Sequence, residues 1–413
     1  MKVCILVYNH IVHDARIIRQ ADALFEAGAD VTVIGVRGPN YFGKAEWIAN
    51  KPWKAIWYNR DKESLEGKLN WFKTSVRSHT AKRILSRVTL KNEVAENAIT
   101  PGYTELIDLA AKQQADVYHA NELTMLPVGY YAGRRAKAKV IYDVHEFYTD
   151  EEENTPEPHR ALLRAVESKY IGQVDHVVAV SEGMADALVR QYNITRPTVI
   201  RNFPPLSWMP PTSKPKNNDK LSILYHGNLG FGTRGLQDLL GCLAYLDENI
   251  EIHLRGRLSE EAKEKFDSGV KGARCSVFYH GWVSIEESMR LIAEHDVGLV
   301  LTQPTCTNNR VTIATKMFDY LLGGLAIVTT NVPGLKWLTD EAEVGFTYSP
   351  GDGKSLGNIL NSLARDRKLL RHLQENARQA ALERYNWDVE KQKLLSIYQA
   401  WNKQEKKVLA QAR

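Results

Sequence analysis

The chain has 413 residues, of which 44% are hydrophobic and 25% are charged, and its formal net charge is +5 at pH 7. This composition excludes a disordered or membrane-spanning chain, and so small a net charge without a reader motif argues against nucleic acid binding. A single hydrophobic core stops growing at about 250–300 residues, so we expect two domains. The first apolar run is too short for a signal peptide, and we therefore expect a cytoplasmic protein.

In the first half, apolar segments typical of buried strands alternate with an amphipathic pattern typical of helices. We predict strands at 2–8, 31–36, 116–122, 139–147, 175–181 and 197–202. One helix is predicted at 15–27, and another follows the strand at 116–122 and ends at about residue 133. Alternating strands and helices favour a doubly wound parallel sheet, which binds its ligands at the carboxyl ends of the strands. The polar residues of the first loop, among them His10, are therefore candidate ligand contacts.

Five prolines between 204 and 220 predict an extended connection between the two domains. Beyond it, strands are expected at 221–225, 250–255, 276–280, 297–301 and 325–329, followed by three helical segments from 353 to the end. The predicted organisation is a first domain at 1–203, a linker at 204–219, a second domain at 220–387 and a final helix at 388–413 that crosses back to the first domain.

The segment before the strand at 325–329 carries a possible phosphate and ribose site. Ile313, Met317 and Leu321 recur every four residues, which predicts one helix with Lys316 and Asp319 on another side. The ammonium group suits diphosphate oxygens, and the carboxylate suits ribose hydroxyls. The alternative is an ordinary surface ion pair one helical turn apart.

A glycine-rich turn follows the first strand of the second domain. Gly227, Gly230, Gly232 and Gly235 keep side chains away, so that backbone amides at the start of the next helix can approach a diphosphate, and Arg234 adds a positive charge. The pattern lacks the spacing of a dinucleotide-binding motif, and a glycine-rich turn alone is weak evidence.

A basic segment at 68–91 contains seven basic residues and no acid, interleaved with apolar side chains. It favours either a solvated helix face or a helix lying on an anionic membrane surface. The four cysteines are scattered without metal-ligand spacing, so neither a disulfide nor a zinc site is expected, and no acid pair is spaced for another metal.

The segment 309–324 resembles the motif N-R-x-x-x-P-x-K-x-F-E-Y-x-x-x-G of the family-four retaining glycosyltransferases. Ala314 stands where proline is usual, Asp319 replaces the ribose-binding glutamate, and Val311 occupies the place of an earlier glutamate that contacts the sugar. The residues that match are Asn309, Arg310, Lys316, Phe318, Tyr320 and Gly324.

Further segments resemble the same family in order and spacing. In the glycine-rich loop Asn228 replaces the first of two phosphate-binding cations, and Arg255 is a possible substitute. A turn containing Gly281 matches the place where the family holds the donor base. In the first domain Asn121 replaces a histidine that can touch the sugar. The other first-domain matches are Asp14, Arg16, His119, Tyr142, Asp143, His145 and Glu146.

The resemblance implies the α/β GT-B architecture, in which two Rossmann-like doubly wound domains face each other across a cleft. It also implies a retaining glycosyltransferase that moves a hexose-type sugar from a nucleotide diphosphate donor to a hydroxyl acceptor without a metal or cofactor. The resemblance further implies a role in cell-surface polysaccharide or glycolipid assembly. The acceptor is then expected to be lipid-linked and the protein to lie at the inner face of the membrane.

The resemblance assigns the candidate residues to three groups. Arg234, Lys316 and Asn121 would be catalytic. Donor binding would use Gly227, Asn228, Gly230, Gly232, Arg255, Gly281 and Asp319, and the acceptor side would use His10, Asp14, Arg16, His119, His145 and Glu146. For Asp14 and Arg16, a helix cap and a surface arginine are equally weighted alternatives. A catalytically silent partner subunit and a nucleotide-sugar 2-epimerase remain alternative functions.

Overall fold

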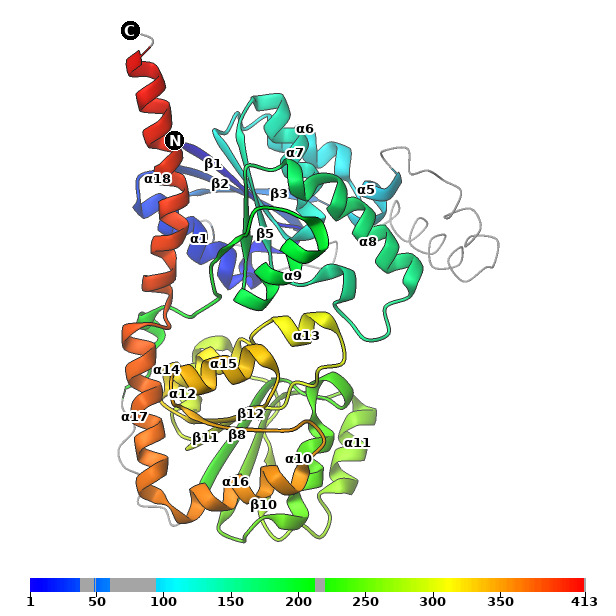
Figure 1. Cartoon of the computed structure of the whole chain (residues 1–413), viewed down its shortest axis with the longest axis vertical. Helices are drawn as coiled ribbons and strands as arrows, with labels where there is room; N and C mark the ends of the chain where they lie inside the picture. The colour runs from blue at the N-terminus through cyan, green and yellow to red at the C-terminus, as the bar shows by residue number, and fades with distance from the viewer. Residues whose placement is uncertain (38–47, 49, 60–93, 212–219, 412–413) are drawn as a thin grey trace. The chain divides into compact units, whose positions relative to one another are not determined.

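The computed structural model describes residues 1–37, 48, 50–59, 94–211 and 220–411 (Figure 1). It divides the chain into two compact units, Met1–Ile200 together with Lys391–Arg413, and Arg201–Glu390. Each unit has its own parallel sheet, so the prediction of two Rossmann-like α/β domains is confirmed. The basic segment at 68–91 lies outside the described residues.

The sheet of the first unit has the strand order β3-β2-β1-β4-β5-β6-β7, and every neighbouring pair is parallel. Its strands are β1 Lys2–Leu6, β2 Asp30–Arg37, β3 Lys54–Asn59, β4 Val117–Asn121, β5 Lys139–Val144, β6 His176–Ala179 and β7 Thr198–Val199. The helices are α1 Ala15–Glu26, α5 Val94–Ile99, α6 Tyr103–Ala111, α7 Glu122–Ala136, α8 Glu157–Tyr170 and α9 Glu182–Tyr192, together with most of α18 Trp387–Gln411.

The sheet of the second unit has the order β10-β9-β8-β11-β12-β13 and is also parallel. Its strands are β8 Leu221–Asn228, β9 Ile250–Arg257, β10 Ser276–Tyr279, β11 Val297–Val300, β12 Ala326–Thr330 and β13 Gly345–Tyr348. The helices are α10 Leu236–Cys242, α11 Glu260–Gly269, α12 Ile285–Ile292, α13 Thr307–Val311, α14 Lys316–Gly323, α15 Pro333–Glu341, α16 Gly353–Arg365 and α17 Arg367–Glu383.

Apolar side chains of the second sheet point alternately to two cores. Ile223 and Tyr225 of β8 join a core with α10 and α16, whereas Leu224 between them joins a core with α14 and α17. This alternation follows from the two-residue period of a strand, and it requires helices on both faces of the sheet. Figure 1 shows α16 and α10 together and α14 and α17 apart from them.

Two expectations need correction in the second unit. The predicted linker begins at Pro204, but Phe203 is fully buried in the second core and Trp208 packs against it, so this part of the chain belongs to the unit. The predicted helix around Ile313 is broken, because α13 ends at Val311 and α14 begins only at Lys316. The Thr312 hydroxyl donates to the carbonyl of Asn308 at 2.7 Å, a local bond that competes with helix continuation.

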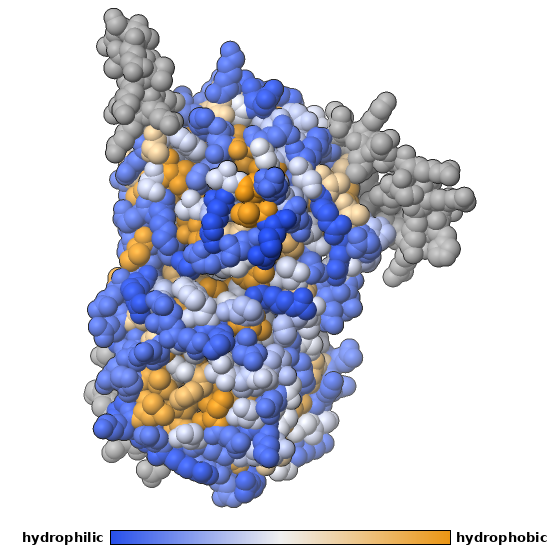
Figure 2. Space-filling view, in the orientation of Figure 1, coloured by the Kyte–Doolittle hydropathy of each residue, from blue (hydrophilic) through white to orange (hydrophobic). Residues whose placement is uncertain are grey.

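Strand β3 was not predicted from the sequence. Its interior residues are all only partly buried, so they show neither the alternation nor the continuous apolar run that identifies a strand. Hydrophilic residues cover most of the face drawn in Figure 2, with smaller apolar areas between them. Among the described helices, none is long and apolar enough to span a membrane.

Candidate active site

The order of strands in the second sheet defines where a ligand should bind. Strands β8 and β11 are neighbours, but the chain continues from β8 to β9 on one side and from β11 to β12 on the other. The segments that leave their carboxyl ends therefore diverge, and ligands of open α/β sheets bind at this switch point. The glycine-rich turn follows β8, and the segment that leads to Lys316 follows β11.

Lys316 is the first residue of α14, and its Nζ atom lies 4.4 Å from the centroid of the Tyr225 ring. Burial and the neighbouring Arg234 lower its pKa to about 7, although Asp319 acts in the opposite direction. A cation at a helix N-terminus also opposes the helix dipole. The free protein therefore disfavours the charged form of Lys316, which is only about half protonated at pH 7, and a bound anion would favour that form.

The backbone at Gly227 makes room for this lysine. Gly227 has φ +99°, and a Cβ atom there would lie 3.6 Å from Cε and 3.7 Å from Nζ of Lys316. A larger side chain would be strained and would point at the ammonium group. The glycine-rich turn and Lys316 therefore lie next to each other.

His226 is a member of this site that sequence reasoning missed. Its Nε2 atom lies 3.6 Å from a carboxylate oxygen of Asp319. Burial, Lys316 and Arg255 lower the pKa of His226 to about 3, so the imidazole is neutral at pH 7. Its position directly before Gly227, at the carboxyl end of β8, was the available signal.

The amides of the glycine-rich turn differ from expectation. Gly235 donates to the Gly232 carbonyl at 3.0 Å and Leu236 to the Gly230 carbonyl at 2.9 Å, so these two helix-start amides do not face a ligand. Among the described groups, the Gly230 and Phe231 amides have no acceptor. They and the exposed Arg234 side chain are donors that this turn can offer to a ligand.

The remaining donor-side candidates lie near the ends of β8, β9 and β10. Asn228 ends β8 and is exposed, and Arg255 of β9 is partly buried, which lowers its pKa. The Gly281 carbonyl accepts from the Gly256 amide at 2.8 Å. Trp282 next to it is 62% exposed.

In the first unit, the predicted residues Arg16 and His119 converge on Asp143 of β5. Arg16 donates to one carboxylate oxygen at 2.6 Å, whereas the amide of Gln20 lies 2.7 Å and Nε2 of His119 lies 3.4 Å from the other. Burial would raise the pKa of Asp143, but Arg16, His119 and His145 hold it well below its usual range. Arg16 is thus a core residue, which contradicts the alternative of a surface arginine.

Asn121 and His145 lie at the carboxyl ends of β4 and β5. Asn121 is fully buried, and its side-chain oxygen lies 3.2 Å from Nε2 of His145. Burial and Arg16 lower the pKa of His145, but hydrogen bonds to Asp143 and Glu122 reverse this and raise it to about 9. His145 is therefore protonated at pH 7, and the Asn121 side chain is already engaged within the domain.

The other acceptor-side candidates have separate surroundings. The Asp14 side chain accepts from the Ile17 amide at 3.2 Å, which is the helix-capping role given as the alternative. His10 stacks on the ring of Trp57, with centroids 4.4 Å apart. Glu146 is partly buried directly after His145, beyond the end of β5.

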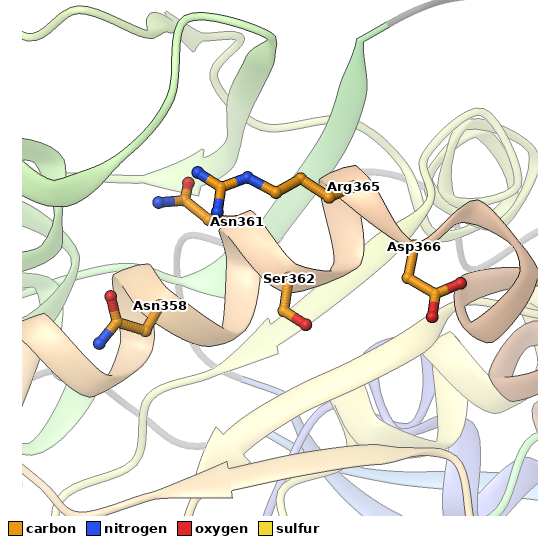
Figure 3. A pocket seen from close by; sticks show the side chains of 5 residues that line it. All are labelled: Asn358, Asn361, Ser362, Arg365 and Asp366. Atoms are coloured by element: carbon orange, nitrogen blue, oxygen red, sulfur yellow. The ribbon is translucent and has the colours of Figure 1, made fainter.

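One hollow of about 690 Å³ lies along α16, away from these residues (Figure 3). Arg365 pairs there with Asp247 at 2.6 Å, and Asn361 binds the backbone around it. Asp247 precedes β9, so the hollow lies at the amino ends of the strands, opposite the glycine-rich turn. Its lining residues are Asn358, Asn361, Ser362, Arg365 and Asp366.

The described residues contain no group of three or more histidine, cysteine or acidic side chains placed to hold a metal ion. All four cysteines are buried and free. The donor side offers three cations, Lys316, Arg234 and Arg255, and the carboxylate of Asp319. Two parallel α/β domains with such a cationic switch point are the features of a GT-B glycosyltransferase.

Comparisons with known proteins give the particular family. The Glycosyltransferase Family 4 profile matches residues 15–207, and a glycosyl transferase-like profile matches residues 238–396. The chain therefore belongs to the family-four, group 1 glycosyltransferases with the GT-B fold. No curated protein sequence matches the chain.

Solved structures of the same fold have low sequence identity to this chain. HepE from Anabaena, solved with UDP-glucose, is 15% identical with a TM-score of 0.69, over 97% of this chain and 100% of HepE. A Rickettsia africae glycosyltransferase is also 15% identical, with a TM-score of 0.69 over 97% and 98% of the chains. Sucrose-phosphate synthase from Thermosynechococcus elongatus is 15% identical with a TM-score of 0.70, over 97% of this chain and 99% of the synthase.

Proposed function

We propose that this glycosyltransferase moves a hexose-type sugar from a nucleoside diphosphate sugar to a hydroxyl acceptor, with retention of anomeric configuration. The observation that carries the proposal is the convergence of Lys316 and Arg234 at the switch point of the second sheet, where Lys316 has a lowered pKa. HepE, of the same fold, was solved with UDP-glucose. Polysaccharide or glycolipid assembly is the proposed setting.

In the proposed reaction, the bond between the anomeric carbon and the diphosphate oxygen breaks as the acceptor oxygen attacks on the same face. The acceptor proton passes to the departing phosphate oxygen. Lys316 and Arg234 stabilise the negative charge that develops on the diphosphate, and Asp319, which lies 3.6 Å from the His226 imidazole, accepts hydrogen bonds from the ribose. Two protein cations supply this stabilisation without a metal ion.

Calorimetric titration with several nucleoside diphosphate sugars, followed by assay of nucleotide release with and without EDTA, tests the proposal. We expect binding to at least one donor and release that EDTA does not change. Arg234→Gln should lower turnover about 100-fold or more, because a lost oxyanion donor costs about 3 kcal/mol. Arg371→Gln, at an exposed position of α17, is the control, and equal turnover of the two variants would refute the assignment.

A catalytically silent partner subunit is the second candidate. Val311 ends α13 and supplies no carboxylate where the family has a sugar-contacting glutamate, and the exposed Asn228 supplies no positive charge. This candidate predicts nucleotide-sugar binding without nucleotide release, alone or with any acceptor. Val311→Glu would then be the variant to test for restored turnover.

A further inference from the structure

We propose that Arg37 binds an anionic group on the acceptor, so that the acceptor is an acidic or phosphorylated molecule. The inference extends the proposed function and rests on it, because only a transferase has an acceptor. Arg37 is the last residue of β2, at the carboxyl edge of the first sheet. It was not among the residues that the sequence indicated.

The Arg37 guanidinium is held on an aromatic face. Its Cζ atom lies 5.0 Å from the centroid of the Trp57 ring, and its Nε atom is buried without a hydrogen-bond partner. Among the described residues, no carboxylate lies within ion-pair distance of Arg37. Stacking fixes the plane of the guanidinium, which presents its N–H donors in the fork geometry that suits carboxylate and phosphate groups.

Three other arginines of this unit, by contrast, have a carboxylate partner. Arg16, Arg160 and Arg196 each meet a carboxylate, at 2.6, 2.9 and 2.8 Å respectively. A partly buried cation without a counter-charge is disfavoured, because desolvation is not offset by an ion pair. The missing counter-charge at Arg37 is therefore expected to come from a ligand.

Gly35 allows the loop after β1 to pack closely against β2 beside Arg37. A Cβ atom there would lie 2.5 Å from Cγ1 of Ile11, so only glycine lets the loop after β1 lie across β2. That loop carries His10, which stacks on Trp57. Strands β1 and β4 form the switch point of this sheet, so the loop borders the place where the first domain should bind its ligand.

The test measures anion binding directly in the full-length chain. Every chain in this test, including the parent, carries the substitutions Lys316→Gln and Arg234→Gln, which remove the phosphate site of the second domain. Inorganic phosphate and methyl glucuronide are titrated by calorimetry, with neutral methyl glucoside for comparison. We expect Arg37→Gln to weaken binding of at least one anion about tenfold or more, with an intermediate loss in Arg37→Lys.

Arg190→Gln, an exposed arginine on α9, is the matched control and should bind like its parent. Stronger binding of phosphate would indicate a phosphorylated acceptor, and stronger binding of glucuronide an acidic sugar. Equal affinities in the Arg37→Gln and Arg190→Gln chains, or binding of neither anion by the parent, would overturn the inference. Failure of nucleotide release in the chain without substitutions would instead count against the proposed function, so the two failures are distinguishable.

Discussion

The Tyr398 hydroxyl lies 2.8 Å from Nδ1 of His119, although 279 positions separate the two residues. Tyr398 belongs to α18, whereas His119 belongs to β4 and faces Asp143 with its other nitrogen. A proton on Nε2, directed at the ionised Asp143, leaves Nδ1 to accept from the hydroxyl. The last helix thereby supplies a polar partner at the centre of the first domain.

Tyr398→Phe should lower the free energy of unfolding by about 1–3 kcal/mol, because it leaves a buried imidazole nitrogen without its donor. Urea unfolding followed by circular dichroism measures the change. Tyr245→Phe is the control, because Tyr245 is 43% exposed, and it should stay within about 0.5 kcal/mol of the parent. A Tyr398→Phe chain as stable as the control would show that the bond is unimportant.

Nucleotide binding should be coupled to proton uptake at Lys316. Its pKa of about 7 in the free protein should rise when a diphosphate lies beside it, so at pH 8 binding should take up about one proton. Affinity should fall about tenfold between pH 6 and 8 relative to Lys316→Arg, which stays charged throughout. Calorimetry with UDP in buffers of different ionisation enthalpy gives the proton count, and zero uptake would contradict the coupling.

Lys316→Met should stabilise the free protein while abolishing nucleotide binding. The folded-state pKa of about 7 is below the unfolded value of 10.5, so below pH 7 folding must bury a charge, and this cost disappears as pH rises toward 10.5. We expect a gain of about 0.5–2 kcal/mol at pH 6 that is lost by pH 10. Thermal unfolding at both pH values measures it, and destabilisation at pH 6 would refute the explanation.

His145 should give the opposite dependence. Its folded-state pKa of about 9 exceeds the unfolded value of 6.5, so its contribution is complete below pH 6.5 and is lost as pH rises through 9. The parent should therefore lose about 2–3 kcal/mol more than His145→Gln between pH 6 and 10. His372→Gln on the exposed surface serves as the control, and parallel pH profiles of His145→Gln and the parent would contradict the assignment.

Gly235→Ala should damage the donor site through a clash. Gly235 has φ +74°, and its Cβ would lie 1.9 Å from the Leu301 carbonyl oxygen, where β11 leads toward Lys316. Gly272→Ala is a matched control, since Gly272 has φ +83° but no atom within 4 Å of its Cβ. Gly272→Ala should lower the free energy of unfolding by about 1 kcal/mol through backbone strain. Gly235→Ala should lower it by more than about 3 kcal/mol and should abolish UDP binding. Similar unfolding midpoints would show that the turn can adapt.

The sequence predicted the two parallel-sheet domains because buried parallel strands are continuous apolar runs, as in β1 and β12. It also indicated Lys316, Asp319 and Arg234, since each belongs to a motif local in sequence. It missed β3, whose residues are half-buried, and it missed the break before Lys316, which depends on the hydroxyl of Thr312.

The centre of the first domain was less predictable from sequence. Arg16 was expected on the surface or at the substrate, because nothing local shows that Asp143 lies beside it. Gln20 and Tyr398 were missed for the same reason, since their partners are more than 100 residues away. Such contacts are set by how strands and helices assemble, which periodicity does not encode.

The split of the first unit into Met1–Ile200 and Lys391–Arg413 has a consequence for synthesis on the ribosome. When the first 200 residues have emerged, His119 still lacks Tyr398, and the entire second unit must be translated before that partner exists. The domain that begins the chain is therefore the last to be completed, and the nascent chain carries an unfinished buried polar centre until translation is almost over.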